Sequence, residues 1–449
     1  MDMANGYLRK KIINFKKQNM TATAVPVLQK ERIDIIDSLR GVAILGILLM
    51  NIPGFSSAGD PFIRNEYGTI NYKVWFFVSW IADGTQRALF SMLFGAGILL
   101  FLANKTKQDN PISAADYFFR RQLWLIVFGL FNIYILLWSG DILFDYGCYG
   151  LIMFVFRSWD PKKLLIAAGV CFLLMLAREN RNLYLDKRTI SRGEAIEKID
   201  TTVTKLTPRQ KEHLSAMEDF RGRSDTASRH KRMDRRIRMM SGAYVDSYDY
   251  RTTSYLDNII EYTYFGIWDV LLFMFIGMAF YKTGILMGKS SVKFYAIMCI
   301  VGFAIGLFFS YWQIKPIVDA RFNFYNYTKN ISISFYEAGR TFRTFGIFGS
   351  LMLLFKSGVF KWFFKLFRPV GQMAFTNYLT QSIACAIIFY GLGFGLYGQF
   401  ERYQIYLVVL AIWTMQIIWS HIWLHYFQYG PFEWIWRQLT YWKKLPLRK

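Results

Sequence analysis

Charged side chains are scarce in this chain of 449 residues: they make up 19% of it, whereas 54% of the residues are hydrophobic and 19% are aromatic. The apolar residues gather in blocks of roughly 17–25, the length that crosses the hydrocarbon of a bilayer as a helix. So little charge, arranged around such blocks, excludes an ordinary soluble domain. We predict an all-α fold, a polytopic integral membrane helix bundle of about ten transmembrane helices with a charged extracytoplasmic insertion.

Acidic residues are fewer than basic ones, 31 against 54, which leaves a formal net charge of +23. A basic protein can bind nucleic acid, but no recognition module with aromatic residues interleaved among basic ones is present, and we expect no nucleic-acid partner. The Lys and Arg residues instead crowd the short loops between the apolar blocks, as the positive-inside rule describes. The expected partner of this charge is the lipid bilayer with its anionic surface.

Cysteine and histidine number only four each. The cysteines lie in or beside apolar segments without the spacing of metal ligands, so we expect small buried hydrophobes and no metal. Two histidines fall in a charged stretch, and two fall at the end of the last apolar block. These residues are Cys148, Cys171, Cys299, Cys385, His213, His230, His421 and His425. The basic N-terminal segment LRKKIINFKK lacks the apolar core of a cleavable signal peptide, and none is expected.

Ten apolar stretches are predicted to cross the membrane, with boundaries soft by several residues. An apolar approach to the second stretch, at 75–81, would raise the count to eleven if it also crosses. In this arrangement the basic short loops all fall on one side, so both termini are expected in the cytoplasm. The predicted stretches are residues 36–55, 86–103, 121–138, 142–157, 162–177, 259–281, 292–312, 342–360, 372–394 and 403–425.

The chain is therefore predicted to have five parts. A basic cytoplasmic tail (1–35) precedes an N-terminal transmembrane bundle of about five spans (36–177). A charged extracytoplasmic loop domain (178–258) separates it from a C-terminal transmembrane bundle of about five spans (259–427), and an amphipathic cytoplasmic tail ends the chain (428–449). The basic run SRHKRMDRRIRMM in the loop domain indicates a solvated helix face or, alternatively, a surface for lipid head groups or an acidic ligand.

The first predicted span carries polar residues that a membrane helix would otherwise avoid. Asp37 and Arg40 are three residues apart, so they share a helix face and can form a pair at the cytoplasmic mouth. Asn51 follows about three turns later on roughly the same face, near the outer end. Either these groups line a polar cavity, or Asp37 and Arg40 form an ordinary anchoring pair while Asn51 makes an interhelical hydrogen bond.

More polar residues fall near the outer ends of the next spans. Asp83 and Arg87 stand at the start of the second span, Asn132 lies inside the third, and Asp141 occupies a tight turn between the third and fourth. If they converge with Asn51, they form an ionisable pocket that is a candidate active or binding site. The alternative is that Asp83 and Arg87 merely pair at the interface while Asp141 caps a helix.

Five motifs stand out along the chain: RGVAILGILLMN (40–51), LFSMLFGAG (89–97), GDIL (140–143), GQMAFTNYLTQ (371–381) and YGPFEWIWR (429–437). Together they resemble one family, the YeiB-like bacterial inner-membrane proteins, whose C-terminal half is called domain of unknown function 418. That family is similar to a broader group of transmembrane acyltransferases, which includes the lysosomal heparan glucosaminide N-acetyltransferases and the acyltransferase type 3 proteins. The resemblance implies a multi-pass protein of the bacterial cytoplasmic membrane that moves an acyl group from cytoplasmic acyl-CoA to an extracytoplasmic glycan or lipid acceptor.

The implied site departs from the acyltransferases in one respect, because no histidine stands at 51–82 and Asn132 replaces the histidine that YeiB-like relatives often carry in the third span. A desolvated acid could take over as the base. Cofactor binding at the cytoplasmic mouth is expected of Asp37 and Arg40. Catalysis at the outer end is expected of Asp141, Asp83 and Asn51, and substrate binding beside it of Arg87 and Asn132.

Two other functions use the same residues. A transporter for a small molecule or lipid would need intramembrane polar groups along its pathway, although no inverted repeat is evident. A non-catalytic membrane protein could instead bind another envelope protein or a glycan through the loop domain. The sequence leaves the oligomeric state open.

Overall fold

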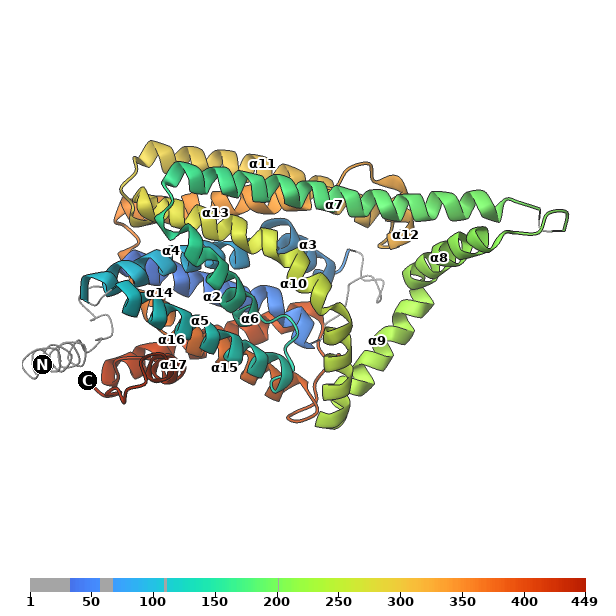
Figure 1. Ribbon diagram of the computed structural model, residues 1–449. Helices are drawn as coiled ribbons and strands as arrows, with labels where there is room; N and C mark the ends of the chain where they lie inside the picture. Colours follow the sequence, from blue (N-terminus) through green and yellow to red (C-terminus); the bar gives the residue numbers. More distant parts are fainter. Residues whose placement is uncertain (1–32, 57–67, 109–110, 201) are drawn as a thin grey trace, which may run out of the picture.

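The computed structural model describes residues 33–56, 68–108, 111–200 and 202–449, and the regular elements of this part of the chain are helices. Its one β feature is an isolated bridge between Phe427 and Arg448. The predicted all-α class is therefore confirmed. Figure 1 shows a bundle of long, nearly parallel helices with a helical arm that projects from one end.

Each predicted span overlaps with a helix of the bundle, although α5, α7 and α10 begin or end ten or more residues from the predicted bounds. The helices are α2 (Asp34–Ser56), α4 (Thr85–Gln108), α5 (Pro111–Tyr134), α6 (Leu143–Met153), α7 (Pro161–Glu197), α10 (Tyr244–Lys282), α11 (Val292–Asp319), α13 (Tyr336–Ser357), α15 (Ala374–Phe389) and α16 (Arg402–Tyr426). Shorter elements connect them: α3 (Ile70–Ile81), η2 (Phe154–Ser158), η3 (Ile285–Met287), α12 (Phe324–Asn330), α14 (Lys361–Gln372) and α17 (Pro431–Tyr441).

Four helical stretches of the described chain have both the length and the mean hydropathy of a membrane span: Asp34–Ser56, Ile70–Ala103, Val292–Asp319 and Arg402–Tyr426. The second of these joins α3 to α4. The protein is thus a polytopic membrane helix bundle, while the total of about ten spans stays a prediction.

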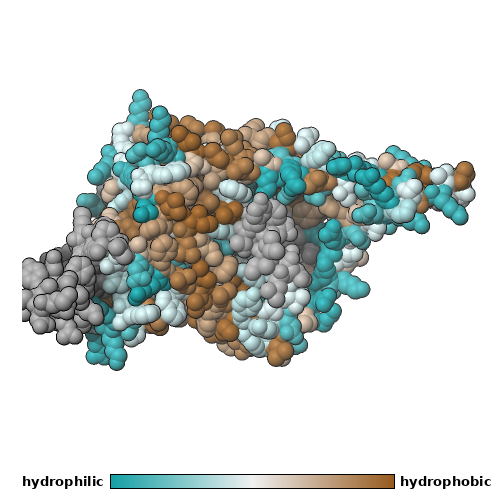
Figure 2. Space-filling view, viewed as in Figure 1, coloured by the Kyte–Doolittle hydropathy of each residue, from teal (hydrophilic) through white to brown (hydrophobic). Residues whose placement is uncertain are grey.

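The outward faces of the bundle are apolar, as lipid contact requires. Figure 2 shows a brown hydrophobic band across the body, with hydrophilic residues at its two ends and along the arm. Large exposed apolar side chains lie on α5, α7, α11 and α16, among them Leu123, Leu173, Ile300, Leu407 and Ile418. A surface of this size is a liability in water and is stable against hydrocarbon.

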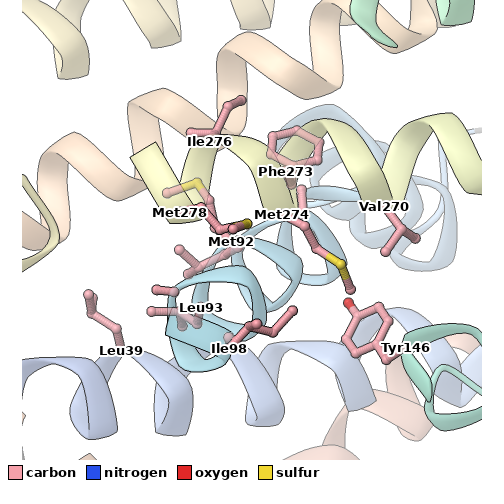
Figure 3. Close-up of a cluster of buried hydrophobic side chains, with 14 of the residues drawn as sticks. Leu39, Met92, Leu93, Ile98, Tyr146, Val270, Phe273, Met274, Ile276 and Met278 are labelled. Carbon is pink, nitrogen blue, oxygen red and sulfur yellow. The ribbon is translucent and has the colours of Figure 1, made fainter. Parts of the chain in front are cut away.

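The centre of the bundle is built by close contact between α4 and α10. A Cβ atom at Gly277 would lie 1.8 Å from the carbonyl oxygen of Met92, and one at Gly95 would lie 2.2 Å from that of Met274. Glycine at both positions lets the two backbones touch, which is how membrane helices gain packing energy. Figure 3 shows the buried side chains around this contact, including Met92 and Met274.

The arm consists of the outer part of α7 together with α8 (Pro208–Ser224) and α9 (Thr226–Ser241). The domain boundaries predicted at 178 and 258 fall inside α7 and α10, which are continuous helices of 37 and 39 residues. Arg221 of α8 binds Glu197 of α7 with two hydrogen bonds of 2.8 and 2.9 Å. The charged insertion is therefore an ordered helical extension of two bundle helices.

Candidate functional site

A cavity of about 230 Å³, here called the main cavity, lies inside the bundle between α2, α4, α5, α6, α15 and α17. Ile33 and Asp37 at the start of α2 line it together with Arg437 and Tyr441 of α17, so one end faces the side of the bundle where the chain ends (Figure 1). The lining changes from charged residues at this end to apolar residues deeper inside. A cavity of this composition suits an amphipathic ligand.

The charged mouth is formed by Asp37, Arg40, Arg121, Glu433 and Arg437. Asp37 and Arg40 form the ion pair that their spacing predicts, with 2.8 Å between Oδ1 and the guanidinium nitrogen. The charges of Arg40 and Arg437 both act on Arg121. Three guanidinium groups therefore share one opening.

The carboxylates of the mouth leave two of these arginines without an ion pair in the described part of the chain. Glu433 accepts hydrogen bonds from the backbone N–H groups of Phe375 and Thr376, at 2.7 and 3.1 Å, and thereby caps the start of α15. Among the described residues, Arg121 and Arg437 have no ion pair. Arginines held in this way at an opening are a favourable site for a phosphate or carboxylate.

The docking of α17 against α5 fixes the position of Arg121. Its guanidinium carbon lies 3.9 Å from the ring centroid of Trp436, and the indole N–H of Trp436 donates to the Arg121 carbonyl oxygen at 3.0 Å. Cation–π stacking holds the arginine while leaving its N–H groups available. The apolar part of the cavity begins beside it and is lined by Phe90, Leu93, Phe94, Ile98, Leu125 and Phe375.

Two tyrosines, Tyr146 and Tyr378, line the inner part of the main cavity. The Tyr378 hydroxyl donates to Oδ1 of Asp141 at 3.1 Å, and the amide nitrogen of Asn132 donates to the same oxygen at 2.7 Å. The other carboxylate oxygen of Asp141 accepts from the Phe144 N–H at 2.8 Å. Asp141 therefore caps α6, and the Tyr378 hydroxyl connects its carboxylate to the main cavity.

Asp141 stands in the loop that joins α5 to α6, outside both helices. Burial raises the pKa of its carboxyl, because the charged form loses its water, and the hydrogen bonds from Asn132, Phe144 and Tyr378 partly offset that rise. A carboxyl with a raised pKa can accept a proton near neutral pH.

A buried ion chain crosses the bundle beside Tyr146. Arg87 of α4 pairs with Asp269 of α10, Asp269 pairs with Arg340 of α13 at 2.6 Å, and Arg340 pairs with Glu337. The Tyr146 hydroxyl donates to the Arg87 carbonyl oxygen at 3.2 Å. Arg87 thus forms its ion pair with another helix, whereas the sequence left a pair with Asp83 as one alternative.

The predicted site residues do not lie in one place. Asp37 and Arg40 line the main cavity, Asn132 and Asp141 bind each other behind Tyr378, and Arg87 belongs to the ion chain. The carbonyl oxygen of Asp83 accepts from Arg343 at 3.1 Å, and Asn51 is half-buried on α2. The outer pocket expected from Asn51, Asp83, Arg87 and Asp141 does not coincide with the main cavity, because none of these four lines it.

Several residues of the site were not singled out from the sequence. From the sequence alone, Arg121 is one of several basic residues in a short loop and Arg437 belongs to a segment that suits a membrane-interface anchor. Tyr378 is there more readily an interhelical hydrogen-bonding group than a substrate contact. Asp269 can be identified from the sequence, because a carboxylate inside an apolar span marks a functional or paired position. Its partner Arg340 stands just before the eighth predicted span, where the sequence favours a pocket residue and an interfacial anchor equally.

The comparisons with known proteins agree with the resemblance drawn from the motifs. Residues 280–443 match the family model described as protein of unknown function (DUF418). The chain is 29% identical over 444 residues to the uncharacterized protein YxaH of Bacillus subtilis, covering 94% of this chain and 98% of that protein. It is also 29% identical over 424 residues to the uncharacterized protein YeiB of Escherichia coli, covering 91% and 96%. The resemblance to YeiB-like proteins is thereby confirmed. No solved structure matches the chain.

Proposed function

We propose that this protein is an acyltransferase of the bacterial cytoplasmic membrane, which takes an acyl group from cytoplasmic acyl-CoA and passes it to an extracytoplasmic acceptor. The observation that supports this function best is the composition of the main cavity. Its mouth holds Arg40, Arg121 and Arg437, and an apolar chamber leads from there to Tyr146 and Tyr378. The phosphates of an acyl-CoA would bind the arginines, and its acyl chain would enter the apolar chamber.

The same end of the bundle carries the start of α2 and the C-terminal helix α17. The positive-inside rule assigns that end to the cytoplasm, because basic residues gather in the short loops there. The arm then lies outside, where it would meet a glycan or lipid acceptor. This orientation puts the arginine mouth on the side where acyl-CoA is available.

The chemistry would use Asp141 as the base. The acceptor hydroxyl or amine gives its proton to the Tyr378 hydroxyl oxygen, which passes its own proton to the Asp141 carboxylate, while the acceptor oxygen or nitrogen forms a bond to the thioester carbonyl carbon. The C–S bond breaks, and the CoA sulfur leaves with the proton that Asp141 returns through Tyr378. Asn132 and Tyr378 hold this carboxylate in place through hydrogen bonds of 2.7 and 3.1 Å. No histidine is needed at this position if burial raises the pKa of the acid.

The test is binding of acetyl-CoA and palmitoyl-CoA to the full-length protein in nanodiscs by calorimetry. We expect saturable binding that weakens about tenfold or more in Arg121→Ala, since a hydrogen bond to a charged group contributes roughly 1.5–3 kcal/mol. Arg120→Ala is the matched control, because Arg120 pairs with Asp116 and does not line the cavity. Absence of binding by both thioesters would refute the assignment.

A transporter for an amphipathic anion is the second candidate function. It is favoured by the ion chain from Arg87 to Glu337, because buried ionisable groups within a membrane often mark a pathway for ions or protons. Liposomes that contain a fluorescent phospholipid distinguish the two functions. Movement of that lipid between the leaflets, lost in Arg121→Ala and without any binding of acyl-CoA, would favour the transporter.

A further inference from the structure

A second cavity, of about 470 Å³, lies between the arm and the outer end of the bundle, and we call it the outer cavity. Its walls come from α7, α8, α12 and the start of α13. They include Arg178, Glu179, Asn182, Asp186, Phe324 and Glu337. It shares no lining residue with the main cavity, so a ligand here would be independent of the acyl transfer proposed above.

The carboxylates of the outer cavity are not equally available. Glu179 accepts hydrogen bonds from the N–H groups of Tyr336 and Glu337, at 2.9 and 3.3 Å, and thereby caps α13. Glu337 is itself paired with Arg340. These two acids are therefore occupied within the fold, which leaves Asp186 as the carboxylate available to a ligand. The lining carries more carboxylates than guanidinium groups, so an organic cation is the competing ligand that the test has to exclude.

Two polar side chains of α7 are free to bind a ligand. Asn182 and Asp186 lie four residues apart, so both project from one helix face into the outer cavity. In the described part of the chain neither forms a hydrogen bond through its side chain, and the side chain of Asp186 is exposed. Together they offer two N–H donors and three oxygen acceptors, which match hydroxyl groups.

Aromatic rings complete the outer cavity. Phe220 of α8 packs against the ring of Tyr325, and Phe324 lies edge-on to Tyr327. Phe324 is 44% exposed, although its neighbours Tyr325 and Thr328 are buried. A flat apolar ring beside planar polar side chains suits a ligand that has both C–H faces and hydroxyl groups.

We propose that the outer cavity binds a polyhydroxylated ligand of the hexose class. The ring of Phe324 packs on a C–H face of the sugar, while Asp186 accepts from its hydroxyl groups and the Asn182 amide both donates and accepts. The volume of about 470 Å³ falls within the range of small-molecule sites.

The test is saturation-transfer NMR with glucose, N-acetylglucosamine and glucosamine on the full-length protein in nanodiscs. We expect saturable binding of a hexose, weakened at least tenfold in Asp186→Ala and in Phe324→Ala. Both side chains are exposed, so both variants should keep the thermal midpoint of the wild type. Asp219→Ala is the control, because Asp219 is an exposed acid of the same arm that does not line the cavity.

Two results would overturn the proposal. One is the absence of binding by all three sugars, or binding that both variants retain. The other is saturable binding of tetramethylammonium that is lost in Asp186→Ala, since this would make the ligand a cation. Neither result bears on the binding of acyl-CoA in the main cavity.

Discussion

The ion chain predicts a large effect for a change that barely alters shape, Asp269→Asn. The side chain of Asp269 is 7% exposed and pairs with both Arg87 and Arg340. Neutralising it removes the acidic ion-pair partner of Arg87, while Arg340, which is 2% exposed, retains Glu337. Breaking a buried ion pair by removing one partner costs about 3–5 kcal/mol.

The lower part of that range is expected here, because Arg87 is 40% exposed and Glu337 remains. We therefore expect Asp269→Asn to lower the free energy of unfolding by about 3 kcal/mol. The assay is reversible unfolding of the protein in mixed detergent micelles, followed by circular dichroism. The double variant Asp269→Leu/Arg87→Leu should recover at least half of the loss, since it also removes the unpaired cation.

A loss of less than about 1 kcal/mol would refute this reasoning, because that is the contribution of an exposed ion pair. A double variant that is less stable than Asp269→Asn would also contradict it. Either result would mean that water reaches Asp269 and Arg87 within the bundle. The ion chain would then be a hydrated pathway rather than a buried structural contact.

Three further predictions follow from single contacts. Gly277→Leu should destabilise the bundle by several kcal/mol in the same unfolding assay, because a side chain there meets the Met92 carbonyl oxygen. Burial raises the pKa of the Asp141 carboxyl, so its contribution to the free energy of unfolding is present at low pH and is lost as the pH rises through the raised value. Asp141→Asn should remove this pH dependence of stability. Hydrogen bonding to Lys329 lowers the pKa of Glu194, so this contact is lost as the pH falls through that value, and proteolysis of the arm should then increase.

Each of these has a control or a contradicting outcome. Gly97→Ala should leave stability nearly unchanged, because no atom lies within 4 Å of the added Cβ. An unchanged pH dependence of stability in Asp141→Asn would show that another group is responsible. Arm proteolysis in Glu194→Gln should already be high at neutral pH, and resistance there would contradict the role of that contact.

Local patterns in the sequence could predict part of this fold. The pair of Asp37 and Arg40 depends only on helical spacing, and the structure confirms it at 2.8 Å. The first apolar stretch, predicted at 36–55, became α2 at Asp34–Ser56 for the same reason. The continuation of α7 to Glu197 was less evident, because the loss of apolar residues after 177 marks a change of surroundings and not the end of the helix.

The candidate site depends on contacts between residues far apart in the chain, which spacing cannot reveal. Arg121 becomes part of the mouth because Trp436, 315 residues later, packs on its side chain. Arg87 pairs with Asp269 across 182 residues. Each of these charges can be explained locally as a loop or interface residue. Only the packing of α17 places Arg121 at the mouth, and only the packing of α10 places Arg87 in the ion chain.

The central claim is that the main cavity holds the acyl chain of an acyl-CoA. Photocrosslinking with a palmitoyl-CoA analogue that carries a diazirine at the end of its chain tests this most directly. After proteolysis and mass spectrometry, the label is expected on α4 at 90–98 or on α6 near Tyr146, and Arg121→Ala should reduce it while Arg120→Ala should not. Label confined to lipid-facing positions of α11 or α16, unchanged in Arg121→Ala, would contradict the claim.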